Sequence, residues 1–155
     1  MNGDGYNFKQ LKDAILKRSV DTSWEVARLE WRLQHVHFVD EPETCLCGHF
    51  PIIEICVLKN IRNRNLAEVG NVCVKKFMGI RSDKIFNCIK RIQKDADKAP
   101  NAEMIALLSQ QNLISDWEKK FSINTMLKRN LTATQLAKRR EINLKILNNI
   151  VQVKI

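Results

Sequence analysis

Glycine and proline are scarce in this chain, with 5 Gly and 3 Pro among 155 residues. This composition disfavours collagen-like, disordered and all-β proteins. No apolar run is long enough to span a bilayer, and the first residues, MNGDG, show no basic-then-apolar signal segment. We therefore expect a cytoplasmic protein without a membrane contact. In that compartment the five cysteines are expected to be thiolate ligands or buried thiols, not disulfides.

Acidic residues are fewer than basic ones, 17 against 26, so the formal net charge is +9. A basic balance favours association with polyanions, nucleic acid first. The Lys and Arg residues are spread along the chain and form no single run. Charge alone therefore also fits a chain whose excess charge only keeps it soluble. The apolar share, 45%, is ordinary for a domain that buries a core.

Helical spacing of apolar residues is the commonest pattern in the chain. It predicts helices over residues 7–18, 24–34, 73–78, 83–98, 101–108, 116–129 and 133 to about 150. Asn101, Ser115 and Thr132 are the expected N-caps, the last two as parts of capping boxes. Gly79 is the expected C-cap of the helix that begins near Cys73. Cys88 lies on an apolar stripe and is interpreted as a core thiol.

Residues 34–40 (QHVHFVD) alternate between apolar and polar side chains, which predicts a short strand. Val36 and Phe38 then lie on one face, and His35 and His37 on the other. We interpret the two histidines as the polar face of an edge strand. A metal-binding or catalytic pair is the alternative.

Four of the five cysteines lie in one stretch, from Cys45 to Cys73. Zinc prefers thiolate and imidazole ligands in a tetrahedron. Cys45 and Cys47 are placed as a knuckle, where Gly48 permits the positive φ that such a turn often needs. A hairpin of strands 52–59 and 66–69 follows. Cys73 then lies in the first turn of a helix, where free amides stabilise a thiolate.

The fourth zinc ligand is left open by the sequence. Cys56 would complete a four-thiolate site, but it lies in the middle of a predicted strand. His49 is close to the knuckle, but ligands at 45, 47 and 49 crowd one side of the ion. We favour Cys56 narrowly and keep His49 as the alternative. A hairpin with buried thiols and no metal is the remaining interpretation.

The stretch resembles a group of small, uncharacterised phage-, plasmid- and bacterium-encoded proteins that are described as zinc-ribbon-like. The resemblance is carried by Cys45-Leu46-Cys47-Gly48-His49, Ile53, Asn60, Val69-Gly70-Asn71-x-Cys73 and Phe77, and extends over residues 40–150. It implies zinc binding and a phage or mobile-element setting, and implies no enzyme activity. Residues 61–65 (IRNRN) depart from the pattern, because relatives often carry Thr-Gly or Asn-Gly there.

The predicted fold class is α+β: mostly helical, with a small zinc-bound β-hairpin of the treble-clef type and a C-terminal helical region. Residues 1–43 would supply N-terminal helices and a short strand. Residues 44–79 would form the zinc-binding hairpin module, and residues 80–155 the helical region. We expect these segments to form one compact domain.

The first functional hypothesis is a non-catalytic, nucleic-acid-binding zinc module. Phosphate contacts by basic side chains give affinity that falls steeply with salt. Five basic residues are expected to surround one platform on the hairpin and the helix after it: Lys59, Arg62, Arg64, Lys75 and Lys76. Arg139 and Arg140 would extend this surface.

The second hypothesis is a protein-binding module, such as a phage factor that occupies a host or defence protein. Zinc would then only stiffen the scaffold, and basic residues would match an acidic protein surface. A treble-clef nuclease with His35 or His37 as base is a remote third hypothesis. The helix from Cys73 offers no His for such a site, and hydrolase, phosphate-loop and deaminase motifs are absent. We therefore expect no enzyme activity.

Overall fold

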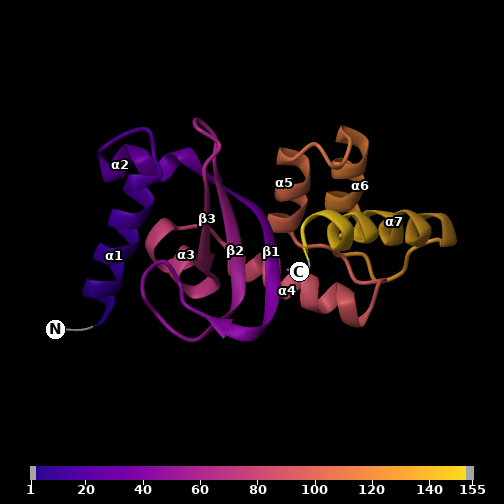
Figure 1. Ribbon diagram of the computed structural model, residues 1–155. Helices are drawn as coiled ribbons and strands as arrows, with labels where there is room; N and C mark the ends of the chain where they lie inside the picture. The colour runs from indigo at the N-terminus through magenta and orange to yellow at the C-terminus, as the bar shows by residue number, and fades with distance from the viewer. Residues whose placement is uncertain (1–2, 153–155) are drawn as a thin grey trace. The chain divides into compact units, whose positions relative to one another are not determined.

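The computed structural model describes residues 3–152, which form two compact units. The first unit covers residues 3–82 and the second covers residues 83–152. The first unit is α+β and contains a three-stranded antiparallel sheet (Figure 1). The second unit is helical. The fold class is therefore α+β, as the sequence predicts.

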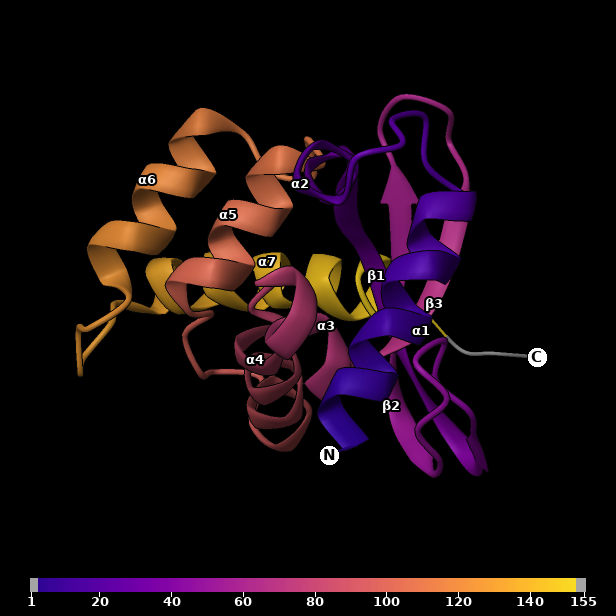
Figure 2. The same ribbon diagram turned by 90° about the vertical axis from the view of Figure 1, so that its left-hand side faces the viewer.

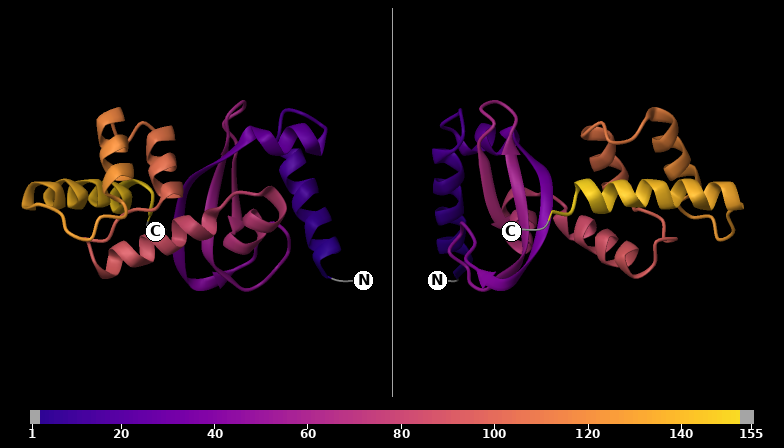
Figure 3. Two further views of the ribbon diagram at one scale, coloured as in Figure 1. Left: turned by 180° about the vertical axis from the view of Figure 1, so that it is seen from behind. Right: turned by 45° about the vertical axis from the view of Figure 1, so that its right-hand side comes forward.

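The sheet of the first unit has the order β1-β2-β3, with both neighbouring pairs antiparallel (Figures 1 and 2). The elements of this unit are α1 (Gly3–Lys17), α2 (Trp24–Ala27), the 3-10 helix η1 (Arg28–Glu30), β1 (Trp31–Glu43), β2 (Ile52–Asn60), β3 (Leu66–Gly70) and α3 (Asn71–Met78). The predicted hairpin and the helix after it are confirmed, and Gly79 ends α3 in the left-handed conformation at φ 71°. Helices α1 and α3 lie on one side of the sheet (Figures 1 and 3).

The predicted helix over residues 24–34 is wrong beyond Ala27. The chain makes one turn of 3-10 helix and then enters β1 at Trp31, whose backbone is extended. Tertiary contacts override the helical pattern here. The indole of Trp31 is buried, and its Nε1 donates to the hydroxyl of Ser19 at 2.9 Å.

A buried carboxylate, that of Glu30, fixes the point where β1 begins. It accepts hydrogen bonds from the backbone amides of Val20 and Asp21, at 2.8 and 2.9 Å. It also accepts from the side-chain amide of Asn60 at 2.8 Å. Segments distant in sequence thus share one acceptor. A continued helix would carry this side chain away from those donors.

Strand β1 is longer than predicted, with 13 residues, and its pairing with β2 shifts register between Leu33 and His35 and again after Phe38. Such irregularities change which side chains face the core. Residues 35–38 nevertheless pair regularly with β2, and both Val36 and His37 are buried, with 0% and 4% of their surfaces exposed. The placement of His37 on a polar, solvent-facing side of the strand is therefore wrong.

Aromatic contacts join the helices of the first unit. The Phe8 ring of α1 lies 5.3 Å from the Phe77 ring of α3 and 5.7 Å from the Trp24 ring of α2, measured between centroids. Four consecutive residues of β2, 55–58, are buried. The central strand therefore contributes side chains from both of its faces to the buried core.

In the second unit, α5 and α6 run side by side and α7 crosses them (Figures 1 and 2). The helices are α4 (Ser82–Lys94), α5 (Ala102–Gln110), α6 (Asp116–Thr125) and α7 (Ala133–Asn149). All three predicted N-caps are present, and both capping boxes are complete. Helix α6 ends at Thr125, earlier than predicted. Cys88 is fully buried, as expected for a core thiol.

Candidate metal centre

The knuckle between β1 and β2 is a tight turn over residues 45–49. The Gly48 amide donates to the Cys45 carbonyl at 2.8 Å, and the Cys45 amide donates to the His49 carbonyl at 2.9 Å. Gly48 has φ +90°, and a Cβ built there would lie 2.4 Å from Oε1 of Gln10. Glycine is therefore favoured at this position by the positive φ of the turn, whereas the flexible Gln10 side chain could move away from a Cβ.

Three cysteines come together at the knuckle and the start of α3. The Sγ atoms of Cys45, Cys47 and Cys73 all lie within 4.8 Å of one another. Tetrahedral zinc with Zn–S bonds of about 2.3 Å requires sulfur atoms about 3.8 Å apart. The three sulfur atoms therefore lie within about 1 Å of the separation that a shared metal ion requires, or closer. Of the residues that the structure describes, no other His, Cys, Asp or Glu belongs to this group.

Backbone amides surround the sulfur atoms. Cys45 Sγ accepts from the amides of Cys47 and Gly70, at 3.5 and 3.3 Å, and Cys47 Sγ accepts from the His49 amide at 3.4 Å. Amide donors stabilise the charged form of a sulfur ligand. The Gly70 contact depends on a close approach, because a Cβ there would lie 3.0 Å from Ile52.

The three thiols share their protons unevenly. A hydrogen bond from the Cys73 thiol, aided by the amides of Cys47 and Gly70, lowers the pKa of Cys45 to about 5. The same bond to Cys45 raises the pKa of Cys73, and burial raises it further. Burial also raises the pKa of Cys47. Hydrogen bonds therefore favour the thiolate form most at Cys45, and metal binding to the group would release the remaining thiol protons.

Cys56, the favoured fourth ligand, does not join this group. It lies in the interior of β2, paired with Val69, and is fully buried. Burial raises the pKa of its thiol to about 12, and the thiol hydrogen-bonds with Ser82. The Ser82 hydroxyl in turn contacts Asn71. Cys56 is therefore part of the packing that fixes the start of α3.

His49 ends the knuckle turn and does not belong to the group of three cysteines. Its side chain is exposed. Together with Cys45 and Cys73 it lines a cavity of about 350 Å³, whose walls include the apolar Ile53 and Val72. His49 thus lines the same cavity as two of the three clustered cysteines.

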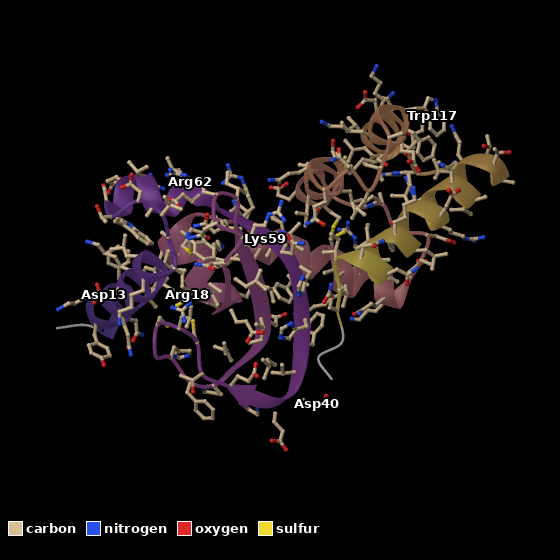
Figure 4. All side chains as sticks on the ribbon, turned by 45° about the horizontal axis from the view of Figure 1, so that its top comes forward. Asp13, Arg18, Asp40, Lys59, Arg62 and Trp117 are labelled. Carbon is tan, nitrogen blue, oxygen red and sulfur yellow. The ribbon has the colours of Figure 1, made fainter. Side chains whose placement is uncertain are left out.

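The basic residues predicted to surround one platform fall into two groups at opposite ends of the hairpin. Lys59, Arg62 and Arg64 lie at the tip that joins β2 and β3. Lys75 and Lys76 lie on α3, which begins directly after Gly70, the residue of β3 that pairs with Ile55 of β2. At about 3.3 Å per residue, Ile55 is about 13 Å along the strand from Lys59. Figure 4 shows Lys59 and Arg62 at one end of the sheet and Asp40 at the other. The structure thus places the five residues in two groups along the hairpin, and only those at the tip are kept in the interface proposed below.

The tip is anchored to the end of α1. The side-chain amides of Asn63 and Asn65 both donate to the Arg18 carbonyl, at 2.9 and 3.0 Å. Asn60 Oδ1 accepts from the backbone amide of Arg62 at 2.8 Å, and the Arg62 guanidinium lies 3.6 Å from the buried Glu30 carboxylate. The basic tip is thus a fixed structure.

Arg32 is a basic residue of this surface that the sequence did not reveal. It is exposed and directly opposite Lys59 in the pairing of β1 with β2. Its Nη1 donates to the carbonyl oxygens of Leu29 and Trp31, at 2.7 and 2.9 Å. Directly opposite residues of an antiparallel pair have side chains on the same face. The apolar pattern places Arg32 in a helix, and only the register of β1 reveals the pair.

Arg139 and Arg140, the predicted extension of the basic surface, have other partners. Arg139 is buried and donates to the carbonyl oxygens of Thr125 and Asp97, at 2.7 and 3.2 Å. Arg140 forms a two-point ion pair with the Asp97 carboxylate. Arg139 therefore joins segments of the second unit. Because Arg140 belongs to that unit as well, the interface proposed below is confined to residues of the first unit.

His35 and His37 do not form part of the cysteine group. His37 is buried, and desolvation lowers the pKa of the half-buried His35, with the charge of His37 as a second cause. Their position gives no support to a metal-dependent nuclease built on this centre.

Comparison with known proteins gives no family: no protein-family model, curated protein or solved structure significantly matches the chain. Within residues 3–152, none of the helices combines the length and the apolar character that crossing a membrane requires.

Proposed function

We propose that the chain is a small, non-catalytic zinc protein that binds nucleic acid through the basic end of its sheet. The surface, called here the tip cluster, consists of Arg32, Lys59, Arg62 and Arg64. The cross-strand pair of Arg32 and Lys59 carries the proposal. Like charges directly opposite one another destabilise a sheet. A polyanion that bridges the two cations relieves this repulsion, and phosphate is the commonest such ligand of Arg and Lys in nucleic-acid-binding proteins.

In this proposal zinc has a structural role. Cys45 and Cys47 come from the loop before β2, and Cys73 comes from the helix after β3. A metal ion therefore ties together the two ends of the hairpin, opposite to the tip. Structural zinc sites contribute directly to folding free energy. The centre fixes the scaffold from which the tip cluster is displayed.

Fluorescence anisotropy with labelled duplex and single-stranded oligonucleotides tests the proposal at about 50 and about 200 mM salt. The wild-type chain is expected to bind, with affinity falling steeply as salt rises. The double variant Arg32→Gln/Lys59→Gln is expected to bind more weakly to every sequence. Its salt slope should fall by about 1 for each phosphate that the variant no longer binds.

The control is Lys75→Gln/Lys76→Gln, which removes the same charge from the other end of the hairpin and should retain the wild-type salt slope. Chemical denaturation of both double variants checks that each is folded under the binding conditions, because Arg32→Gln also removes two hydrogen bonds to the carbonyl oxygens of Leu29 and Trp31. Equal loss of binding in both double variants, or no binding by wild type at low salt, would contradict the proposal.

A protein-binding role is the second candidate, and one observation favours it. Phe50, Ile53 and Val72 are exposed large apolar residues, at 60%, 55% and 78% of their surfaces, and the last two line the cavity beside the cysteines. Apolar exposure of this kind is typical of protein contact sites. If the chain binds no oligonucleotide at low salt, the protein-binding role becomes the favoured function. The resemblance to phage, plasmid and bacterial proteins supports a host-cytoplasm setting for either role.

A further inference from the structure

We propose that His49, and not Cys56, is the fourth zinc ligand, so that the centre is a Cys3His site. The inference rests on the proposed zinc binding and identifies the ligand that completes it. Three thiolates occupy three positions of the tetrahedron that zinc prefers. The fourth position must be supplied from whichever side of the cysteine group still has space and a donor.

The space lies on the side of His49. The cavity of about 350 Å³ is lined by Cys45, Cys73 and His49, and not by Cys56. A ligand that enters the fourth position from this cavity moves through open space. Cys56 faces the packed interior of the sheet, and its backbone is held by pairing with Val69. Its approach would require a shift of β2.

The knuckle turn brings His49 back toward the metal. Gly48 adopts φ +90°, which reverses the chain, and the Cys45 amide then donates to the His49 carbonyl. Residue 49 is therefore fixed beside residue 45, while its exposed imidazole remains able to rotate. Rotation of an exposed side chain about χ1 is rapid and inexpensive. Because the turn reverses the chain after Cys47, ligands at 45, 47 and 49 need not approach the metal ion from the same side.

Glu54 also lines the cavity, and it is the oxygen-donor alternative. Its carboxylate accepts a hydrogen bond from Asn71 at 3.3 Å. This bond fixes the side chain toward the start of α3. Structural zinc sites with three thiolates take a fourth ligand from Cys or His, since the borderline-soft ion prefers sulfur and nitrogen. Among the described residues that line the cavity, His49 is the only such side chain besides Cys45 and Cys73.

Cobalt substitution tests the assignment, because tetrahedral Co²⁺ has intense visible bands and its thiolate charge-transfer absorption grows with the number of sulfur ligands. Cys56→Ser should leave the spectrum and the affinity unchanged. His49→Ala should lower affinity for Co²⁺ and Zn²⁺ at least about tenfold, as loss of supporting interactions alone does. His49→Cys should restore affinity and raise charge-transfer absorption by about one third, from three thiolates to four.

Zinc-edge X-ray absorption of the unmodified protein provides a measurement that does not depend on a variant folding. One nitrogen at about 2.0–2.1 Å beside three sulfur atoms at about 2.3 Å is expected. Four sulfur atoms, or metal loss in Cys56→Ser with retention in His49→Ala, would overturn the assignment to His49. Retention in both variants would also overturn it, in favour of Glu54 or water. A wild-type chain that binds no metal contradicts the zinc proposal itself, and the oligonucleotide titration tests the tip cluster separately.

Discussion

Each unit buries one glutamate, and the two are held in different ways. In the first unit, Glu30 accepts from amides of distant segments, with the Arg62 cation 3.6 Å away. In the second unit, Glu118 accepts from the Ser115 amide of its own capping box and pairs with Lys138 and Lys145. The first arrangement is set by long-range packing. The second begins from a local helix-start motif.

This difference extends to the two units as wholes. The first unit depends on contacts distant in sequence: the Glu30 acceptor, the tip anchored to Arg18, and three cysteines from two ends of a hairpin. The second unit is built from helices whose starts are capped by their own neighbours. We therefore expect metal and long-range contacts to govern the first unit, and helix capping with local charge pairs to govern the second.

Loss of the metal should produce the largest difference between the units. Zinc chelation, or Cys73→Ser, should destabilise the first unit by at least about 3 kcal/mol, since structural zinc contributes free energy of that order or more. Hydrogen exchange followed by mass spectrometry should show reduced amide protection over 45–78 and retained protection over 102–149. Cys88→Ala is the matched control, because it removes a thiol that lies outside the centre. An equal reduction of protection in both units would contradict the comparison.

Acid should reveal the charge pairs of the second unit. Burial alone would raise the pKa of Glu118, but hydrogen bonds from the Ser115 amide, Lys138 and Lys145 outweigh it and lower the pKa from 4.5 to about 2. A depressed folded-state pKa gives stability that is fully present above 4.5 and is lost as pH falls through 2. At about 1.4 kcal/mol per pKa unit, the change from 4.5 to about 2 corresponds to about 3.5 kcal/mol. Denaturation of wild type and Glu118→Gln between about pH 2 and 6 measures it, and the two curves should converge at the acid end.

The sequence predicts what is encoded within a few residues. Asn101, Ser115 and Thr132 are recognisable because a cap and its partner lie in one turn of helix. Gly48 and the cysteines at 45, 47 and 73 are recognisable because metal ligation constrains spacing and turn geometry.

Features that depend on distant partners could not be predicted in this way. The start of β1 is set by the amides that meet at Glu30, and the position of Arg32 depends on strand register. The burial of Arg139 depends on carbonyls of Thr125 and Asp97. No local pattern contains this information. Arg139 and Arg140, although adjacent in sequence, consequently have different partners: Arg139 donates to buried carbonyl oxygens, and Arg140 pairs with the Asp97 carboxylate.

Substitution of Arg139 and of Arg140 tests whether these two neighbours contribute differently to stability. Arg139→Gln removes a buried donor to two carbonyl oxygens, and should cost about 2 kcal/mol of stability in the second unit. Arg140→Gln removes an exposed ion pair with Asp97 and should change stability little, because such pairs are screened by solvent. Thermal denaturation measures both. Neither variant should alter the oligonucleotide affinity beyond the general effect of one charge, and a selective loss in Arg140→Gln would return that residue to the interface.

The smallest expected effect concerns the N-cap position of a helix, which we compare between the two units. Thr132 caps α7, and its hydroxyl accepts from the Gln135 amide at 3.1 Å. Ser23 occupies the same position before α2, but its side chain makes no capping hydrogen bond. Thr132→Ala should therefore destabilise the second unit by about 1 kcal/mol, the usual value of a cap. Ser23→Ala should change the free energy of unfolding by less than about 0.5 kcal/mol. Thr132→Ser should retain most of the wild-type stability, since it keeps the hydroxyl. Urea denaturation of the three variants measures these changes in the free energy of unfolding. If Ser23→Ala lost as much stability as Thr132→Ala, local capping would govern the first unit as well.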